Sequence, residues 1–414
     1  LCFLLQNAIW SVARPAPDVP TSPKRTGEAD SELPIRKKRR IISIFARMEQ
    51  TEIFTANNDA APEPFSGMIP EWAEQDAVVL AWPGEMMDWA PRIEQVRACY
   101  AGIIEAITHF EPVILLHHPL DTPALNLNRL NTKYPIRYLP VLLNDTWVRD
   151  YMPIACLNGD KKEIVKFCFN GWGMKYAACY DNRVAYSLFA EQGFYHSDIA
   201  VKIAEFVVTE GGALESSGDG LILATMSSLF SANRNERIPE REELLKTLLS
   251  ALSCKSIRIT ACGYIPGDDT DGHIDTLARF IDTNTVAYVS PLGCTDLAVK
   301  QSLQQFEAEM HSTVIKDRDP FKLLALPFVE GLRDDDGSLM PASYANFLFV
   351  NGAVLVPTYG VHWDSRALFL FEQYFKGRRE IIPVDCRELI RQHGSLHCAT
   401  MQIPRGFLNP RLLK

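Results

Sequence analysis

The chain has 414 residues, of which 47% are apolar and 22% are charged, so it is long enough to bury a large hydrophobic core. Its formal net charge of −9 argues against a dedicated nucleic-acid-binding protein, because such surfaces are usually basic. No run of about 18 uninterrupted apolar residues occurs, so we expect no membrane span.

The first fifty residues differ in composition from the rest. They are rich in proline, serine and charged residues, with a basic run at 36–40. We interpret 1–67 as an N-terminal extension that is disordered or not native, and 68–414 as a catalytic domain. A nuclear-localisation or nucleic-acid patch is one alternative. Another is that translation starts at Met48 or Met68 and the upstream residues are read-through of non-coding sequence. LCFLLQNAIW is a poor signal peptide, with no basic segment before it.

From about residue 68, short apolar runs alternate with helical patterns. In chain order, the runs predict strands at 77–82, 112–118, 163–169, 220–225, 256–262, 273–281, 285–290, 322–328 and 380–386. The 3.6-residue periodicity predicts helices at 91–110, 197–206, 239–252, 294–310 and 364–377. Asn351-Gly352 lies between two apolar runs, which predicts a β-hairpin. Hairpins mixed with crossovers favour an α/β protein with a mixed sheet or ββαβ modules.

The ten cysteines are scattered, with no C-x-x-C pair and no histidine at zinc-site spacing. In a chain of this size they are expected to be reduced thiols of a cytoplasmic protein, since disulfide frameworks are typical of short secreted chains. No glycine-rich loop has the spacing of a nucleotide-binding motif, so we expect no nucleotide cofactor.

Four polar segments interrupt the apolar pattern, at 144–155, 207–220, 267–280 and 394–402. On a strand, His273 and Asp275 would share one face and point into one pocket. A surface loop of solvated aspartates is the alternative. The same alternation places His397 on the opposite face from Cys398, so a distant histidine is the better partner for this thiol.

One cysteine, one histidine and several carboxylates suit a particular chemistry. A cysteine protease has no need of the extra acids, and zinc ligands at short spacing are absent. Paired carboxylates can each accept two parallel N–H bonds from a planar guanidinium. A thiolate could then attack the central carbon, with histidine as general acid and then general base while ammonia leaves.

The segments together resemble the agmatine deiminase and bacterial-type peptidylarginine deiminase family of guanidino-group-modifying enzymes. The resemblance covers roughly residues 68–407. It lies in MIPEWAEQDAVVLAWP, NDTWVRDYMPI, FNGWGMKY, EGGALESSGDG, SANRN, GHIDT, PASYANFLFVNGAVLVPTYG and GSLHCATMQIP. Each motif alone is modest, and their order along one chain is the stronger signal.

The resemblance implies a single-domain, five-bladed α/β propeller of ββαβ modules, and a reaction that needs neither metal nor cofactor. It implies that Cys398 is the nucleophile and His273 the acid and base. Asp150 and Asp275 would grip the guanidinium, and Glu210 would orient the histidine. Asp269 is the expected acid at the far end of the substrate, and Trp82 and Trp147 are expected beside it, although core packing suits both tryptophans equally.

Each site residue also has an ordinary structural interpretation. Asp150 follows Arg149 and could form a surface ion pair with it. Glu210 could be a turn residue, and Cys398 could be one more buried thiol. The motif context favours the functional interpretation in each case.

The substrate is less well defined than the chemistry. Typical agmatine deiminases carry Gly-Gly-Gly-Asn-Ile-His-Cys, whereas this chain has His-Gly-Ser-Leu-His-Cys at 393–398. We expect agmatine, converted to N-carbamoylputrescine and ammonia. The alternatives are a peptidylarginine or free arginine deiminase, an amidinotransferase of the same fold, or a guanidine-binding protein. We expect a small cationic guanidino compound as partner, with no nucleic acid and no membrane. The sequence does not decide between a monomer and a homo-oligomer. A nucleic-acid role of the basic run is the remaining alternative.

Overall fold

The computed structural model describes residues 52–55, 66–190, 193–236, 238, 240–312 and 320–412. Most of the N-terminal extension and its basic run lie outside the described residues. Among the described residues, every helix is too short or too polar to cross a membrane. The described strands form five separate sheets of mixed direction, which confirms the α/β class.

A recurring unit builds these sheets: two antiparallel strands, a helix, and a third strand parallel to the second. In the unit that follows the third polar segment, the elements are β12 (Ala278–Asp282), β13 (Thr285–Val289), α10 (Leu297–Ser312) and β14 (Lys322–Leu326). The next unit contains β15 (Leu348–Val350), β16 (Ala353–Thr358), α11 (Asp364–Phe375) and β17 (Glu380–Asp385). The predicted hairpin is confirmed here, because Val350 pairs with Ala353 across Asn351-Gly352, and Gly352 has φ +84°.

Two further units carry one extra strand each. The first contains β6 (Ile154–Asn158), β7 (Lys161–Cys168), α6 (Val184–Ala190) and β8 (Ala200–Val208), with β2 (Ser66–Met68) added to β6. The second contains β9 (Glu215–Ser216), β10 (Leu221–Thr225), α8 (Arg241–Leu252) and β11 (Ser256–Thr260), with β1 (Glu52–Thr55) added to β11.

The fifth unit joins the two ends of the described chain. Strand β18 (Met401–Pro404) pairs antiparallel with β3 (Gln75–Ala81), so that Met401 lies opposite Val79. The unit continues with α2 (Ile93–Thr108), β4 (Val113–His117), α3 (Pro123–Leu127) and β5 (Ile136–Pro140). The helix α2 forms because its apolar residues recur at helical spacing, and Val96, Tyr100, Ile103 and Ile107 are all fully buried against the sheet.

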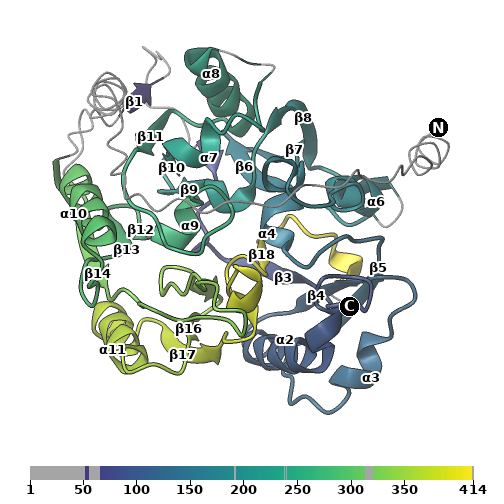
Figure 1. The fold of residues 1–414 in the computed structure, drawn as a ribbon. Coiled ribbons are helices and arrows are strands. Elements are labelled where there is room, and N and C mark those ends of the chain that lie inside the picture. Colours follow the sequence, from purple (N-terminus) through teal and green to yellow (C-terminus); the bar gives the residue numbers. More distant parts are fainter. Residues whose placement is uncertain are drawn as a thin grey trace, which may run out of the picture. The chain divides into compact units, whose positions relative to one another are not determined.

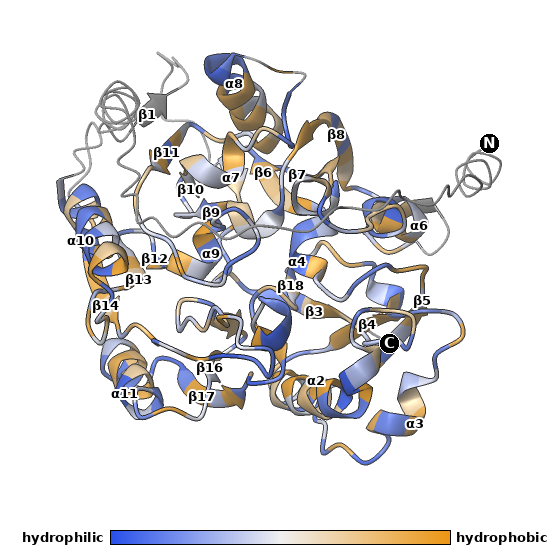
Figure 2. Ribbon diagram, viewed as in Figure 1, coloured by the Kyte–Doolittle hydropathy of each residue, from blue (hydrophilic) through white to orange (hydrophobic). Residues whose placement is uncertain are grey.

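The helices lie on the outside of the sheets, and two short helices lie toward the middle: α4 (Val148–Tyr151) and α9 (Ile274–Leu277) (Figure 1). Outer helices such as α8 and α10 carry hydrophilic residues on one side and hydrophobic residues on the other (Figure 2). The core therefore lies between the helices and the sheets. The polar segments lie toward the middle of the molecule, where they can form a site.

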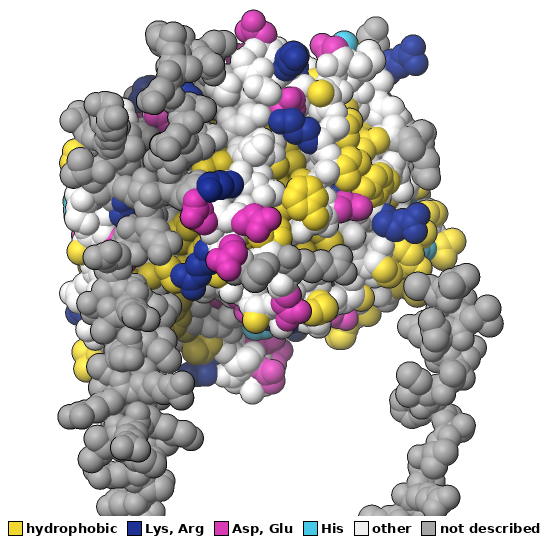
Figure 3. Space-filling view, turned by 90° about the horizontal axis from the view of Figure 1, so that it is seen from above, with side chains coloured by type: hydrophobic (Ala, Val, Ile, Leu, Met, Phe, Trp, Pro, Cys, Tyr) yellow, Lys and Arg dark blue, Asp and Glu magenta, His cyan; other side chains and the backbone are white. Residues whose placement is uncertain are grey.

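The prediction of a helix at 197–206 is wrong, because Ala200–Val208 is strand β8 at the edge of its sheet. Its alternating Val201 and Ile203 suit a strand as well as a helix, and pairing with β7 decides between them. Both side chains stay nearly half exposed, and Phe206 is 60% exposed. The view from above shows hydrophobic side chains exposed between charged ones on this side of the molecule (Figure 3).

Candidate active site

The polar segments meet because each lies just before the first strand of a repeating unit. Asp150 in α4 precedes β6, Glu210 precedes β9, and Asp275 in α9 precedes β12. In the same position, Asn346 precedes β15 and Cys398 precedes β18. Equivalent positions in five successive units therefore bring together residues that are far apart in the sequence.

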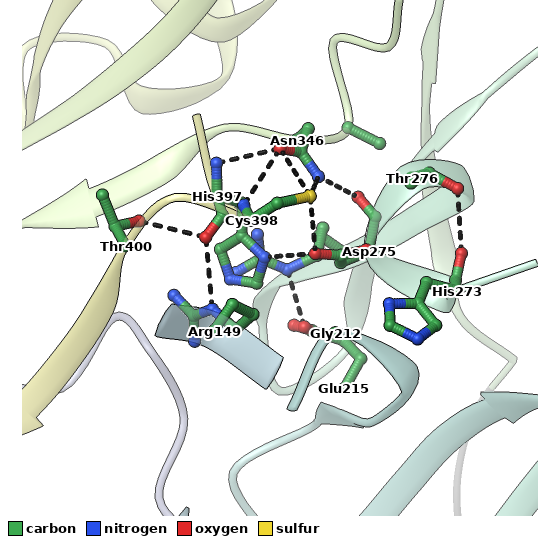
Figure 4. Close-up of polar contacts among 12 residues, drawn as sticks. Arg149, Gly212, Glu215, His273, Asp275, Thr276, Asn346, His397, Cys398 and Thr400 are labelled. Carbon is green, nitrogen blue, oxygen red and sulfur yellow. Dashed lines mark hydrogen bonds and ion pairs between the residues drawn. The ribbon is translucent and has the colours of Figure 1, made fainter. Parts of the chain in front are cut away.

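The sulfur of Cys398 contacts both Asn346 and Asp275 (Figure 4). Its Sγ is 3.6 Å from Asp275 Oδ2 and 3.2 Å from Asn346 Nδ2. A cavity of about 210 Å³ reaches both the thiol and Asp150. The other lining residues are Asp88, Asp145, Trp147, Trp172, Tyr176, Asp269, Thr270, Arg391, Gln392, His393 and Gly394. A small molecule entering this cavity would therefore meet a thiol and carboxylates together.

Asp150 and His273 lie side by side around the Gly211-Gly212 turn. Gly212 N donates to Asp150 Oδ1 at 2.9 Å, and the indole of Trp172 donates to Asp150 Oδ2 at 2.9 Å. His273 Nδ1 is 3.7 Å from Asp150 Oδ1, and its Nε2 is 3.7 Å from Glu210 Oε2. The imidazole is therefore held between two carboxylates, each beyond normal hydrogen-bond length.

The turn needs glycine because there is no room for a Cβ. A Cβ on Gly212 would lie 2.7 Å from His273 Nδ1, 2.9 Å from Asp150 Oδ1 and 3.1 Å from Asp275 Oδ2. One on Gly211 would lie 2.2 Å from the Arg149 carbonyl oxygen. The EGG motif thus lets three functional side chains converge on one point.

Gly212→Ala is expected to reduce turnover by about 100-fold or more, since displacement of reacting groups by about 1 Å can cost that much. Steady-state kinetics on the guanidino substrate proposed below measure this. The control is Gly102→Ala in α2, where a Cβ meets nothing within 4 Å. It should leave turnover intact and stabilise the fold by up to about 1 kcal/mol. Unchanged kinetics in Gly212→Ala would contradict the convergence.

The neighbouring charges and burial shift the pKa values of His273 and Cys398. Burial opposes the charge of His273, but Asp150, Glu210 and Asp275 outweigh it and raise its pKa to about 9. Burial, with Asp275 and Asp150, raises the pKa of Cys398 well above its usual value. These shifts favour an imidazolium at His273 and a neutral thiol at Cys398 at neutral pH.

Glu210 stays charged despite complete burial, although burial itself raises its pKa. His273 and Arg234 outweigh that effect and lower the pKa of Glu210 below its usual value. The guanidinium of Arg234 bonds both Glu210 oxygens through Nε, at 2.9 and 3.0 Å. Within the described residues no group of three His, Cys, Asp or Glu side chains could hold a metal ion.

Most of the site residues predicted from the sequence lie together here, but their local secondary structure differs from the predicted one. His273 and Asp275 lie at the start of the helical turn α9, so the prediction of a strand with a shared face is wrong. Trp147 and Asp269 line the cavity. Trp82 does not: it is 1% exposed and borders a separate cavity with Met87 and Asp121. Core packing explains it fully.

Three residues of the site were not singled out from the sequence: Glu71, Asn346 and His397. Asn346 donates to the thiol, and His397 bridges Asp275 and Glu71 at 2.7 Å on each side. Arg149 does not pair with Asp150; it is buried and bonds Glu71 Oε2 at 3.0 Å. The only signal in the sequence was a polar residue inside an otherwise apolar stretch.

The chain is similar to known proteins in sequence and in fold. Residues 67–404 match the model of the Porphyromonas-type peptidyl-arginine deiminase family. A Legionella pneumophila (strain Paris) protein, provisionally named an agmatine deiminase, is 29% identical over 84% of this chain and 99% of its own. A Porphyromonas gingivalis structure, provisionally named an arginine deiminase, is 40% identical with a TM-score of 0.76, covering 83% of this chain and all of its own. A C. jejuni agmatine deiminase with substrate bound is 30% identical with a TM-score of 0.76, covering 84% and 99%.

The fold and these similarities define an enzyme class: the deiminases among the guanidino-group-modifying hydrolases. The family model matches well over half of the chain, so the chain belongs to the Porphyromonas-type peptidyl-arginine deiminase family.

Proposed function

We propose that this protein is an agmatine deiminase that uses a covalent cysteine mechanism. The observation that carries the proposal is the position of the Cys398 thiol. It lies 3.6 Å from the carboxylate of Asp275 and lines one cavity together with a second carboxylate, that of Asp150. Asp275 Oδ1 is buried and has no hydrogen-bond partner within the described part of the chain. An acceptor left in this state favours a ligand that donates N–H bonds.

In the proposed reaction the two carboxylates hold the guanidinium, whose charge offsets theirs and makes the thiolate of Cys398 accessible. The sulfur attacks the central carbon, and the C–N bond to the leaving nitrogen breaks as His273 gives it a proton, releasing ammonia. The product on the enzyme is an amidino-thioether. His273 then removes a proton from water, which attacks the same carbon and expels the thiolate, leaving N-carbamoylputrescine. Glu210 orients the imidazole throughout.

The acidic lining of the cavity supports a substrate with a second cation. Asp88, Asp145 and Asp269 line it, and Asp269 Oδ2 accepts from the Tyr176 hydroxyl at 2.8 Å. Burial and the neighbouring acids raise the pKa of Asp145 to about 7. A primary ammonium would offset the repulsion among these carboxylates. Agmatine carries such a group, and a blocked arginine peptide does not.

One observation favours an arginine substrate instead: Arg391 also lines the cavity and could meet a carboxylate. Its guanidinium is already ion-paired with Asp334 and Asp335, which makes it less available. Release of ammonia and of a ureido product should be compared for agmatine, free arginine and a blocked arginine peptide. Preference for arginine would overturn the agmatine proposal, and transfer of an amidine to an added amine would indicate an amidinotransferase.

Asp269→Asn is expected to raise the KM for agmatine about tenfold with little change in kcat, because one charge-assisted hydrogen bond to the ammonium is lost. Arg391→Gln is the matched control at the same rim and should leave the KM for agmatine unchanged. If Arg391→Gln impairs turnover while Asp269→Asn does not, the far-end acid has been assigned wrongly.

We also propose that residues 68–414 form one catalytic domain whose five sheets are the blades of an α/β propeller, with β1 and the start of β2, which precede residue 68, added to two of the sheets. The repeated ββαβ unit and the pairing of β18 with β3 support this arrangement.

A further inference from the structure

A buried cluster of charges lies next to Cys398, which contacts one of its members, Asp275. Its centre is Glu71 Oε2, which is 3.0 Å from Arg149 Nη2, 3.1 Å from Arg279 Nη2 and 2.7 Å from His397 Nε2. Arg279 also bonds Glu215 at 2.6 Å, and His397 bonds Asp275 at 2.7 Å. None of the six residues is more than 5% exposed; they are Glu71, Arg149, Glu215, Asp275, Arg279 and His397.

Both ring nitrogens of His397 lie against carboxylates. Nδ1 is 2.7 Å from Asp275 Oδ2, and Nε2 is 2.7 Å from Glu71 Oε2. Ionised carboxylates only accept hydrogen bonds, so a ring that bonds both of them donates from both nitrogens. We refer to this bridge from Glu71 through the ring to Asp275 as the clamp.

This clamp leaves Asp275 with one free oxygen. Oδ2 is occupied by His397, while Oδ1 is buried and has no hydrogen-bond partner among the described residues. A carboxylate tied at one oxygen cannot rotate freely, so the other oxygen keeps a fixed direction. In Figure 4 the ring of His397 lies against Asp275, next to the sulfur of Cys398.

The backbone of His397 is held independently of its ring. Its N donates to Asn346 Oδ1 at 2.9 Å, and its carbonyl oxygen accepts from Arg149 Nε at 3.3 Å. Replacing the side chain should therefore leave Cys398 in place while releasing Asp275, which makes the role of the ring testable.

We infer that His397, clamped by Glu71, is a positioning residue that fixes Asp275 so that Oδ1 alone receives an N–H of the guanidinium. This inference rests on the proposed function. The histidine acts through Asp275, and the acid and base chemistry stays with His273.

Two substitutions separate the two ends of the clamp. In His397→Asn the amide nitrogen can take the place of Nδ1 and still donate to Asp275, whereas in His397→Gln it can take the place of Nε2 and reach only Glu71. Agmatine binding is measured by calorimetry in a Cys398→Ala background, so that turnover does not interfere. His397→Gln is expected to weaken binding about 10- to 100-fold, and His397→Asn clearly less.

A double-mutant cycle shows whether the effect passes through Asp275. In an Asp275→Asn background, His397→Gln should cause no further loss of affinity, because the carboxylate that it orients is gone. Equal losses in the Asn and Gln variants, or a full loss that persists with Asp275→Asn, would overturn the inference. The control is His196→Gln, which removes an exposed His196–Asp198 pair and should bind agmatine as the parent does.

A measurement without substitution of His397 guards against variants that do not fold. With ring nitrogens labelled, His397 should show an N–H group on each ring nitrogen, because each nitrogen lies 2.7 Å from a carboxylate oxygen. The doubly protonated signal that persists in His273→Gln belongs to His397, and its absence would overturn the clamp. If the Cys398→Ala protein binds no agmatine, the proposed function fails as well, whereas binding that ignores His397 contradicts the inference alone.

Discussion

Cys398→Ser is expected to reduce ammonia release from agmatine by at least about 10⁴-fold, because a hydroxyl is a far poorer nucleophile than a thiolate. Agmatine should still bind, since Asp150 and Asp275 are unchanged. The measurement is single-turnover kinetics with detection of the covalent intermediate by mass, which should appear in the parent protein and not in the variant.

The control for this experiment is Cys99→Ser. Burial raises the pKa of Cys99 to about 12, and its Sγ donates to the Asp385 carbonyl at 3.3 Å, a bond that serine can keep. This variant should retain full activity. Full turnover by Cys398→Ser, or a covalent adduct elsewhere, would rule out the thiol mechanism.

His273→Gln should lower kcat about 10²- to 10⁴-fold, the usual contribution of a general acid and base. The pH dependence has a definite sign. The pKa of His273 is raised to about 9, so the imidazolium, which in the proposed mechanism protonates the leaving ammonia, is present below this pH and is lost above it. Turnover by the parent should therefore fall as the pH rises through about 9.

Asp150→Asn tests whether the charge of Asp150 sets the pH at which turnover falls. After burial, which acts in the opposite direction, Asp150 is the largest influence on the pKa of His273 and raises it. Its neutralisation should shift the alkaline fall in activity to lower pH. His311→Gln, at the exposed end of α10, should change neither kcat nor the profile. An alkaline limit unmoved by Asp150→Asn would contradict the electrostatic coupling.

The sequence predicted the local elements well wherever burial and periodicity agree. The helices around α2, α8, α10 and α11 and the hairpin at Asn351-Gly352 are confirmed. The edge strand β8 was mistaken for a helix because its sequence fits both periods and only pairing with β7 distinguishes them.

The site was predictable only in part. The residues that carry charge within glycine-rich or turn-like motifs, such as Asp150, Glu210 and Asp275, could be recognised. Asn346 and His397 could not, because their roles depend on contacts with residues that are distant in sequence. His397 was judged only against its neighbour Cys398, whereas its partners are Asp275 and Glu71, more than a hundred residues away.

The pairing of β18 with β3 has a consequence for how the enzyme matures. Cys398 is carried to the other site residues only when β18 docks on a strand from near the start of the family-matched region. During synthesis, the acids and the histidine can assemble while the sulfur is still absent, and such long-range pairing is formed slowly. Activity should therefore appear in one late step, after β18 has paired with β3.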